Sequence, residues 1–451
     1  MFYNFKKIAV AVSLIVPSFV NAQTMSVEDR LSELEANQSL NIFSFGGYLD
    51  TRYDDIDAEQ TSPAQSAFKG HTQHLRLRSG LNVNAKISPK LNFFSTFATS
   101  KYFNVWQKQN TATGTQPAYL ADAGESRAEN GSQVYLEKAY ADYMFSDSFT
   151  FSFGRLPTMD GPPSHLSLGK ARMGTYPSIG YNSSFDGIAF SYNKAWDDQS
   201  FAARVLYTPF TYNNTSAGKL VGTSPEGLSN VVIAGSKTNS VTPLTSVMFE
   251  YGIKNTGVAN NINVMAMAYQ TGDLAVDGAM FNAGAGAGSG LINFKVGGQV
   301  VAFELTGIMG SGFDLGVTSL QSKVDNSGTA TIPGVGAIYG FGASSEGESL
   351  SGNTTLVSGR YKWNNTFIGG EYLMGGKNVF NYDPSTEVAN GFYGTPGTGT
   401  HAYILHKLTP ELGLRVGYMK QEYKSTPFSF GASGDTDRKI TTVYTNLRLD
   451  F

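Results

Sequence analysis

The chain contains no cysteine among its 451 residues, and only 15% of its residues are charged. The lack of cysteine excludes disulfides, thiolate catalysis and cysteine-ligated metals. Beyond the N-terminus no apolar run approaches the length of about twenty residues that a membrane helix needs. The formal net charge of −3 gives no reason to expect nucleic acid as a partner. What the chain does have is 51 glycines and 13% aromatic residues, a composition typical of a β-barrel with a polar interior.

The N-terminus has the pattern of a secretory signal peptide, which we assign to residues 1–22. Lys6 and Lys7 supply the positive charge, and Ile8 to Val16 the apolar core. The sequence Val20-Asn21-Ala22 is a small-residue cleavage site. A membrane anchor is the alternative, but the apolar run is too short to span a bilayer. We therefore expect export, with cleavage after Ala22.

Residues 23–41 form the second predicted segment, with a helix from about Thr24 to Leu40. Val27, Leu31 and Leu34 have helical spacing, and Ser26 is a candidate N-cap. Two interpretations stay open for this helix. One is a short periplasmic coiled coil that ties subunits together, and the other is an amphipathic linker or a frayed tail.

The segment from His74 to Thr99 predicts a β-hairpin of unusual length. Leu75, Leu77, Leu81 and Val83 alternate with polar or basic residues over about thirteen positions, a period that a strand produces and a helix does not. Such a strand is long for a soluble protein and close to what a tilted strand needs to cross a bilayer.

From residue 42 to residue 451 the chain repeats this unit, with connections that alternate between short and long. This alternation of short and long connections predicts sixteen strands. The sequence does not show where within residues 286–306 one of these strands begins. A spanning sheet must close, because unpaired backbone groups in hydrocarbon cost several kcal/mol each. The fold class predicted is therefore all-β, a transmembrane antiparallel barrel of about 16 strands with a short N-terminal helix. The short connections are predicted at Ser88–Lys90, Ser146–Ser148, Ala195–Gln199, Lys254–Gly257, Ile308–Gly312, Asn364–Asn365 and Thr409–Glu411. The long ones are predicted at Asp54–His71, Tyr102–Gly131, Leu156–Phe185, Pro209–Thr242, Thr271–Gly290, Gln321–Asn353, Gly375–Gly399 and Lys424–Arg438.

Basic residues on the polar faces of these strands are assigned to the lumen, because an arginine at the lipid midplane costs about 2–4 kcal/mol. Asp50 and Glu371 are expected to oppose them, so a weak anion preference is predicted. Aromatic residues near strand ends, such as Tyr143, Trp363 and Tyr444, are expected in interfacial girdles. The predicted pore-lining residues are Arg76, Arg78, Lys86, Arg204, Arg360 and Arg415.

The last strand alternates Val443, Thr445, Leu447 and Leu449 with polar residues and ends on Phe451. This pattern resembles the C-terminal signal that the barrel-assembly machinery of Gram-negative bacteria reads. We therefore expect that machinery as a partner and the outer membrane as the location.

The third long loop, Leu156–Phe185, carries four prolines, which favour a defined path. In sixteen-stranded porins the third loop folds inward and narrows the channel. On that plan, four side chains would lie in the lumen, and otherwise this is an ordered surface loop. These constriction-loop candidates are Asp160, His165, Lys170 and Arg172.

No catalytic set of residues and no cofactor motif stands out, so we expect neither an enzyme nor a cofactor. The histidines lack metal-ligand spacing with acidic neighbours. Asp54, Asp55, Asp57 and Glu59 cluster in the first predicted long loop. A solvated acidic loop is the favoured interpretation, and a divalent cation shared with lipopolysaccharide is the alternative.

Three segments carry a family resemblance: Lys138-Ala139-Tyr140-Ala141-Asp142-Tyr143, Phe153-Gly154-Arg155-Leu156-Pro157 and Asp160-Gly161-Pro162-Pro163. The chain resembles an uncharacterised family of Gram-negative outer-membrane proteins with a short N-terminal coiled coil and a porin-like barrel. The resemblance implies fold and location and defines no solute. Assembly as a homotrimer is implied only by analogy with general porins, whose architecture is similar.

These inferences favour an outer-membrane porin that passes small hydrophilic solutes and contacts lipid and lipopolysaccharide. Sixteen strands enclose a lumen wide enough for water. The alternative is a structural or adhesive barrel that binds partners through its long loops. A barrel enzyme that hydrolyses lipid is a third class, for which no serine, histidine and acidic set is found.

Overall fold

The computed structural model describes residues 42–61, 68–102, 134–170, 172–213, 240–277, 289–334, 336–381, 392–425, 431–432 and 435–451. The predicted signal peptide and the predicted helix lie outside these residues. Within the described ranges, no helix combines the length and apolar character needed to cross a membrane. Contacts divide the chain after Ser44, and the unit Phe45–Phe451 is the one described below.

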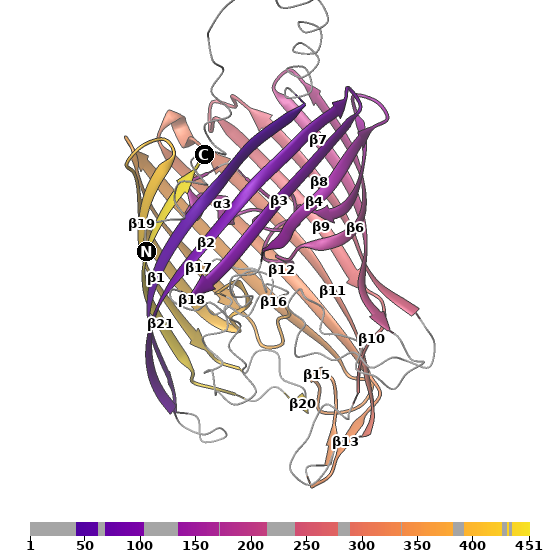
Figure 1. Cartoon of the computed structure of the whole chain (residues 1–451). Helices are drawn as coiled ribbons and strands as arrows, with labels where there is room; N and C mark the ends of the chain where they lie inside the picture. Colours follow the sequence, from indigo (N-terminus) through magenta and orange to yellow (C-terminus); the bar gives the residue numbers. More distant parts are fainter. Residues whose placement is uncertain are drawn as a thin grey trace, which may run out of the picture. The chain divides into compact units, whose positions relative to one another are not determined.

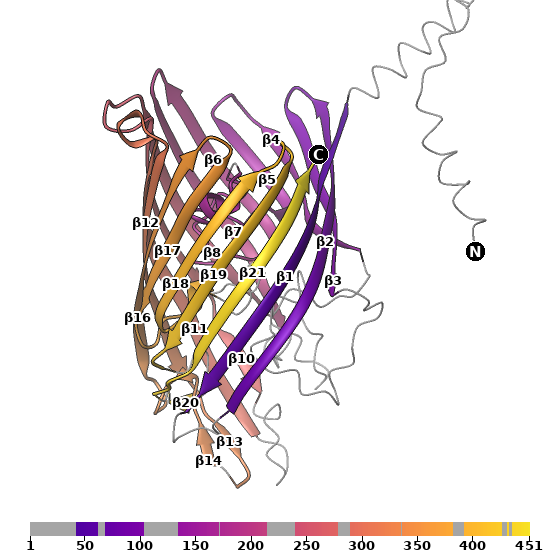
Figure 2. The same cartoon turned by 90° about the vertical axis from the view of Figure 1, so that its left-hand side faces the viewer.

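This unit is a closed antiparallel β-barrel of sixteen strands (Figures 1 and 2). The ring closes between its first and last strands, which pair from Tyr48 opposite Asp450 to Glu59 opposite Lys439. The barrel strands are β1 (Phe43–Gln60), β2 (Phe68–Ser88), β3 (Leu91–Tyr102), β4 (Tyr135–Met144), β5 (Phe149–Leu156), β6 (Phe185–Trp196), β7 (Gln199–Asn213), β8 (Ser240–Lys254), β9 (Asn261–Thr271), β11 (Ser289–Thr306), β12 (Phe313–Ser327), β16 (Ser349–Trp363), β17 (Thr366–Gly375), β18 (Gly397–Lys407), β19 (Leu412–Tyr423) and β21 (Lys439–Asp450).

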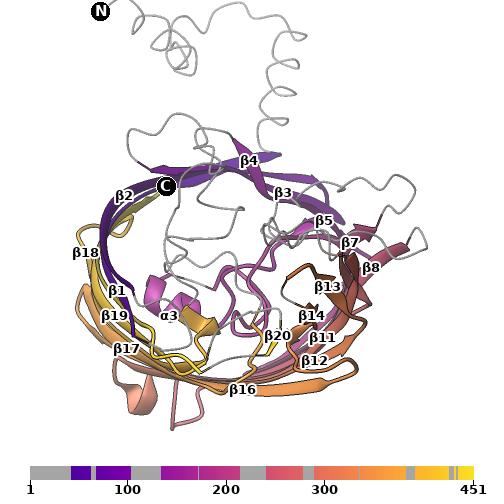
Figure 3. The ribbon, with the colours of Figure 1, turned by 90° about the horizontal axis from the view of Figure 1, so that it is seen from below.

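The remaining elements are short. Strand β10 (Leu274–Asp277) pairs with β11, and β13 (Ala330–Ile332) forms a hairpin with β14 (Gly336–Ile338). Strands β15 (Phe341–Gly342) and β20 (Gly431–Ala432) make a separate parallel pair. Helix α3 (Ser164–Leu168) lies inside the ring of strands, as Figure 3 shows along the barrel axis. The helical turns η4 (Ile308–Gly310) and η5 (Phe392–Gly394) complete the described elements.

The sequence predicted the seven short connections where the structure has them, but some strands are longer than expected. Strand β5 has 8 residues, whereas β1 has 18 and β2 has 21. The first long loop, predicted from Asp54 to His71, is corrected accordingly: β1 continues to Gln60 and β2 begins at Phe68. The cause is continued pairing with β21, in which Ile56 and Ala58 keep facing inward. Asp54 to Glu59 therefore belong to a strand and not to a loop.

The outer face of the barrel is apolar, as a lipid-facing surface requires. Phe249, Ile404 and Val416 are typical, with exposed fractions of 50%, 52% and 45%. Tyr143 and Trp363 are also exposed, consistent with their expected place in aromatic girdles. The girdle assignment of Tyr444 is wrong, because its side chain is only 1% exposed and lies on the inward side of β21.

The interior is less polar than the sequence predicted. Leu206, Met248, Met265 and Leu356 point inward and are fully buried, and they belong to one large hydrophobic cluster. Strands with apolar residues on both faces give a weak alternation signal, so periodicity alone hid these side chains. These buried wall side chains belong to the same cluster as Tyr176, Ile179 and Tyr181 from the connection between β5 and β6.

Candidate functional site

That connection, residues 157–184, is called loop 3 below, and its apolar half packs on the inner wall. Tyr176, Ile179 and Tyr181 are buried. The ring of Tyr181 meets that of Tyr269 on β9 edge-to-face, with centroids 5.5 Å apart. A Cβ atom at Gly180 would lie 2.5 Å from the side chain of Met267. A larger residue at this position would therefore require the end of the Met267 side chain to move.

Helix α3 is held to the wall by two arginines that donate to its main-chain carbonyls. Nη1 of Arg360 on β16 lies 3.0 Å from the Leu166 oxygen, and Nη1 of Arg415 on β19 lies 2.9 Å from the Ser167 oxygen. Carbonyl groups in the last turn of a helix lack full intrahelical partners, and here the two arginines supply donors from outside it. Nε of Arg360 also donates to Asp314 on β12 at 2.7 Å, which fixes the guanidinium plane.

The second half of loop 3 is held by an ion-pair group on β7 and β8. Arg172 pairs with Oε1 of Glu250, and Arg204 donates to Oε2 of the same carboxylate at 2.9 Å. Asn263 on β9 donates to Oε1 at 2.9 Å. One carboxylate thus joins a loop arginine and a wall arginine, and it offsets one of their two positive charges.

His165, on α3, is a titratable side chain of loop 3 that faces β11. Its Nε2 lies 3.7 Å from Oε1 of Glu304 on β11. Burial, with smaller contributions from the charges of Arg172 and Arg360, lowers the pKa of His165 to about 3. The imidazole is therefore neutral at neutral pH and adds no charge to the interior.

The other predicted site residues divide into three groups. Arg76 and Arg78 on β2 are each only 3% exposed, and the guanidinium of Arg78 lies 5.6 Å from the centre of the Tyr48 ring. Lys86 is exposed near the short-turn end of β2. Asp160 and Lys170 of loop 3 line a cavity that residues of β1 to β4 and β21 also line.

This cavity has a volume of about 250 Å³ and lies between loop 3 and the strands where the barrel closes. The sequence did not predict it, because it is formed by elements far apart in the chain. Charged and polar side chains from β2, β3, β4 and β21 face it. Its lining includes Tyr48, Asn82, Thr96, Glu137, Lys138, Met159, Asp160, Lys170, Met173, Arg448 and Asp450.

A buried network on the inner wall was also missed. Nδ1 of His401 lies 2.7 Å from Glu371, and its Nε2 lies 2.7 Å from the Tyr444 hydroxyl. The guanidinium of Arg52, paired with Asp54 at 2.7 Å, stacks 4.1 Å from the centre of the Tyr444 ring. The alternation along each strand could have indicated this network, because it places these residues on the inner face of the barrel, as it does Arg415.

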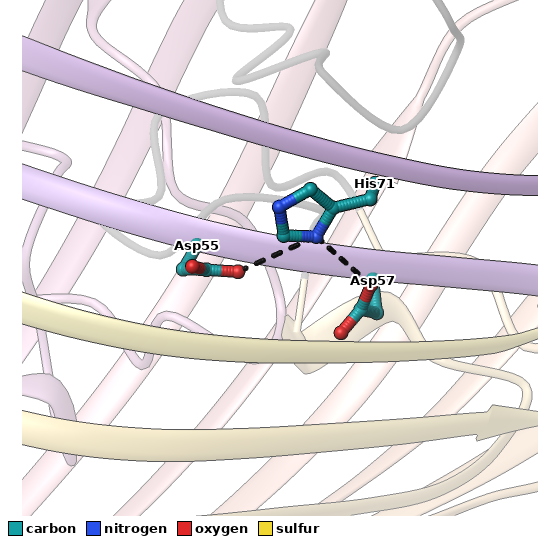
Figure 4. A group of neighbouring side chains, drawn as sticks. All are labelled: Asp55, Asp57 and His71. Atoms are coloured by element: carbon teal, nitrogen blue, oxygen red, sulfur yellow. Dashed lines mark hydrogen bonds and ion pairs between the residues drawn. The ribbon is translucent and has the colours of Figure 1, made fainter.

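The acidic residues of β1 split between the two faces of the barrel. Asp54 is buried inside, whereas Asp55 and Asp57 point outward and meet His71 of β2 (Figure 4). Nδ1 of His71 lies 3.0 Å from Asp57 and 3.6 Å from Asp55. One candidate ligand atom from each residue lies within 4.8 Å of the others. The exposed fractions of His71 (54%) and Asp57 (66%) are those of a solvated surface group.

These observations define the class: a closed sixteen-stranded barrel, apolar outside, with a long loop packed on its inner wall beside a polar cavity. Residues 71–433 match the model of a family described as "Protein of unknown function (DUF3373)". Because the match spans most of the sequence, the chain belongs to this family. None of the curated proteins matches the chain.

Solved structures with a similar fold include three outer-membrane or porin proteins. OmpT of Vibrio cholerae is 13% identical, with 91% of this chain and 98% of that chain covered and a TM-score of 0.45. OprB of Pseudomonas putida is 9% identical, with 93% and 97% covered and a TM-score of 0.47. The anion-selective porin from Comamonas acidovorans is 10% identical, with 91% and 99% covered and a TM-score of 0.47. Because the sequence identities and TM-scores are this low, these similarities say nothing about the solute or the assembly of this chain.

Proposed function

We propose that this protein is a porin of the Gram-negative outer membrane that lets small hydrophilic solutes diffuse through its lumen. The observation that supports this most directly is the opposite character of the two barrel surfaces. The outer face presents apolar side chains such as Phe249 and Ile404, while the inner face carries Arg360, Arg415 and a polar cavity. A closed barrel with this polarity is stable in lipid and holds water inside.

Loop 3 is proposed to constrict the channel. Its apolar half packs on the inner wall from β6 to β12, and the cavity on the β1–β4 side is the proposed route for solutes. The contacts of Arg360 and Arg415 with α3 support a fixed constriction rather than a mobile one. On this proposal the tight packing of loop 3 sets the width of the passage.

The weak anion preference expected from the basic wall residues stays a prediction. The structure weakens the argument for anion preference, because two of the arginines on which it depends are paired with carboxylates. Arg204 is paired with Glu250, and Arg360 is paired with Asp314. The sign of the selectivity then depends on the balance of charge over the whole inner wall, which includes the buried Arg76, Arg78 and Arg415. The reversal potential measured in a salt gradient shows whether the channel prefers anions or cations.

The partners belong to the same proposal. Lipid would cover the apolar outer face, lipopolysaccharide would meet the outward ends of the long strands, and the assembly machinery would read the strand that ends in Phe451. Export with cleavage after Ala22 is tested by N-terminal mass analysis of the mature protein. Chemical cross-linking in the membrane tests the proposed homotrimer, for which subunits joined in threes are expected.

The full-length protein in planar lipid bilayers tests the channel itself. Stepwise ohmic current increments are expected on insertion, because a water-filled passage conducts small ions at any moderate voltage. Folded protein that inserts without any conductance would contradict the proposal.

A second candidate is a structural or adhesive barrel with a blocked lumen. It is favoured by the hydrophobic cluster inside the barrel, where Tyr181, Tyr269 and Phe392 are buried as in a soluble core. The bilayer recording separates the two functions, since a blocked barrel gives no steady current. We propose a passive role in both cases and no catalytic step.

A further inference from the structure

The cavity between loop 3 and the strands β1 to β4 has equal numbers of acidic and basic side chains. Among its described lining residues, three carry a basic side chain and three carry an acidic one. Each of three structural elements contributes one acid and one base. The pairs are Glu137 and Lys138 on β4, Arg448 and Asp450 on β21, and Asp160 and Lys170 on loop 3.

The pair on β4 depends on a β-bulge. Thr96 of β3 pairs with Lys138, but the next residue, Phe97, pairs with Leu136, so that Glu137 is an extra residue in the ladder. In a regular strand, two consecutive side chains point to opposite faces. A bulge changes the direction of a side chain, and here both Glu137 and Lys138 line the cavity. Leu136, in contrast, remains exposed on the outer face.

Hydrogen bonds hold Glu137, Arg448 and Asp450 in place. The Tyr48 hydroxyl donates to Oε2 of Glu137 at 2.8 Å, and Glu137 is only 7% exposed. Arg448 donates to Asp450 at 2.9 Å and to Asp50 at 3.3 Å. The main-chain N–H of Asp160 donates to Asn182 at 2.8 Å, which fixes this end of loop 3. The cavity therefore presents ordered charged groups of both signs on its wall side, and Asp160 and Lys170 line it on the loop side.

We propose that this cavity is the selective part of the passage and that it favours small zwitterions, which carry one ammonium and one carboxylate group. This inference rests on the proposed channel function. A lone anion or cation meets as many repulsive as attractive side chains, so its net electrostatic gain is small. A zwitterion can orient its two ends toward opposite charges, so that both of its ends are attracted at once.

The size of the cavity agrees with this solute class. A volume of about 250 Å³ accommodates roughly eight water-sized groups. A molecule as large as a small amino acid fits with some of its hydration water. Met159 and Met173, which also line the cavity, offer apolar contacts for a short carbon chain.

The first experiment compares two isomers in liposome swelling with the full-length protein. L-alanine is a zwitterion, and lactamide is a neutral molecule of the same atomic composition. Alanine is expected to enter about twofold faster, because only alanine carries the two charges that the cavity complements. Equal rates, or faster entry of lactamide, would overturn the inference.

The second experiment measures the chloride-to-potassium permeability ratio in planar bilayers under a KCl gradient. A ratio near one is expected for the unmodified protein. Lys170→Gln should lower the ratio about twofold, and Asp450→Asn should raise it about twofold, because each leaves one uncompensated charge in the passage. The double variant should return the ratio to near one.

Lys323→Gln is the matched control, since this lysine is exposed and paired with Asp325 at 2.8 Å outside the cavity. Its ratio should equal that of the unmodified protein. A strongly ion-selective unmodified channel, or single variants that do not move the ratio, would overturn the inference and leave the channel proposal standing. Folded protein with no conductance at all would instead remove the channel proposal, and this inference with it.

Discussion

Arg415 donates a hydrogen bond of 2.9 Å to the main-chain carbonyl of Ser167, which lies 248 residues earlier in the chain. The sequence places Arg415 on the polar face of a late strand and Ser167 in an early loop. Only closure of the barrel brings the two together. The arginine therefore acts on loop 3 as a positioning residue, in addition to its charge in the lumen.

The first prediction concerns this contact. Arg415→Met should destabilise the protein by about 1–3 kcal/mol, because the buried Ser167 carbonyl loses its donor. It should also increase the fluctuation of the open-channel current, because one end of α3 is released. Denaturant titration and bilayer recording measure the two effects. Lys362→Met, which removes an exposed cation on β16, should change neither the stability nor the current fluctuation. If the current of Arg415→Met fluctuated no more than that of the unmodified protein, α3 would not need this hydrogen bond to stay in place.

The second prediction concerns the carboxylate that joins two arginines. Glu250→Gln leaves Arg172 and Arg204 facing each other without a counter-charge, and should cost about 3 kcal/mol of stability. The free energy of unfolding, measured in lipid vesicles, reports the loss. Glu422→Gln is the control, since its pair with Lys420 is exposed on both sides and such pairs are worth about 0–1 kcal/mol. Equal losses in the two variants would mean that the Glu250 group is solvated.

The third prediction tests which face of β19 meets lipid. Val416→Arg should cost about 2–4 kcal/mol, because a charge near the bilayer midplane loses its hydration. Thr441→Arg, on an outward position opposite Asp57 near the long-loop end of β21, should cost much less. Unfolding of both variants in vesicles of the same lipid gives the comparison. A Val416→Arg variant as stable as the original would contradict a lipid-facing outer surface.

The fourth prediction follows from the lowered pKa of His165. The unfolded chain binds a proton on this histidine below a pH of about 6.5, whereas the folded chain does so only near pH 3. Stability should therefore fall as pH decreases between these values, by up to about 1.4 kcal/mol per pH unit from this group. His165→Gln should remove that part of the slope. Urea unfolding from pH 7 to pH 4 measures both proteins, and identical slopes would place His165 in a solvated environment.

The sequence alone was sufficient for the barrel and its strand count. Alternation along β21 and the turn at Ser88–Lys90 are local signals, and a spanning sheet has no stable alternative to closure. The strand ends could not be read in the same way. At Asp54–Glu59 the acidic residues suggested a loop, whereas pairing with β21 keeps them in a strand.

The candidate site depended more on tertiary structure. The sequence could assign Arg204, Arg360 and Arg415 to a polar face, but not their partners. It placed Tyr444 in a girdle because an aromatic residue near a strand end usually serves there, while the structure packs its ring against Arg52 and bonds its hydroxyl to His401. Constriction by Asp160, His165, Lys170 and Arg172 stays a prediction.

The sequence by itself determined that this chain alternates apolar and polar side chains along sixteen strands, because this alternation depends only on residues that are close together in the sequence. Only the tertiary structure decided which charges meet inside the barrel, how loop 3 packs on the wall and where a polar cavity remains. The physical reason is that a side chain's face follows from its neighbours in sequence. Its partners across the lumen, such as Ser167 for Arg415, are fixed only when distant strands close the ring.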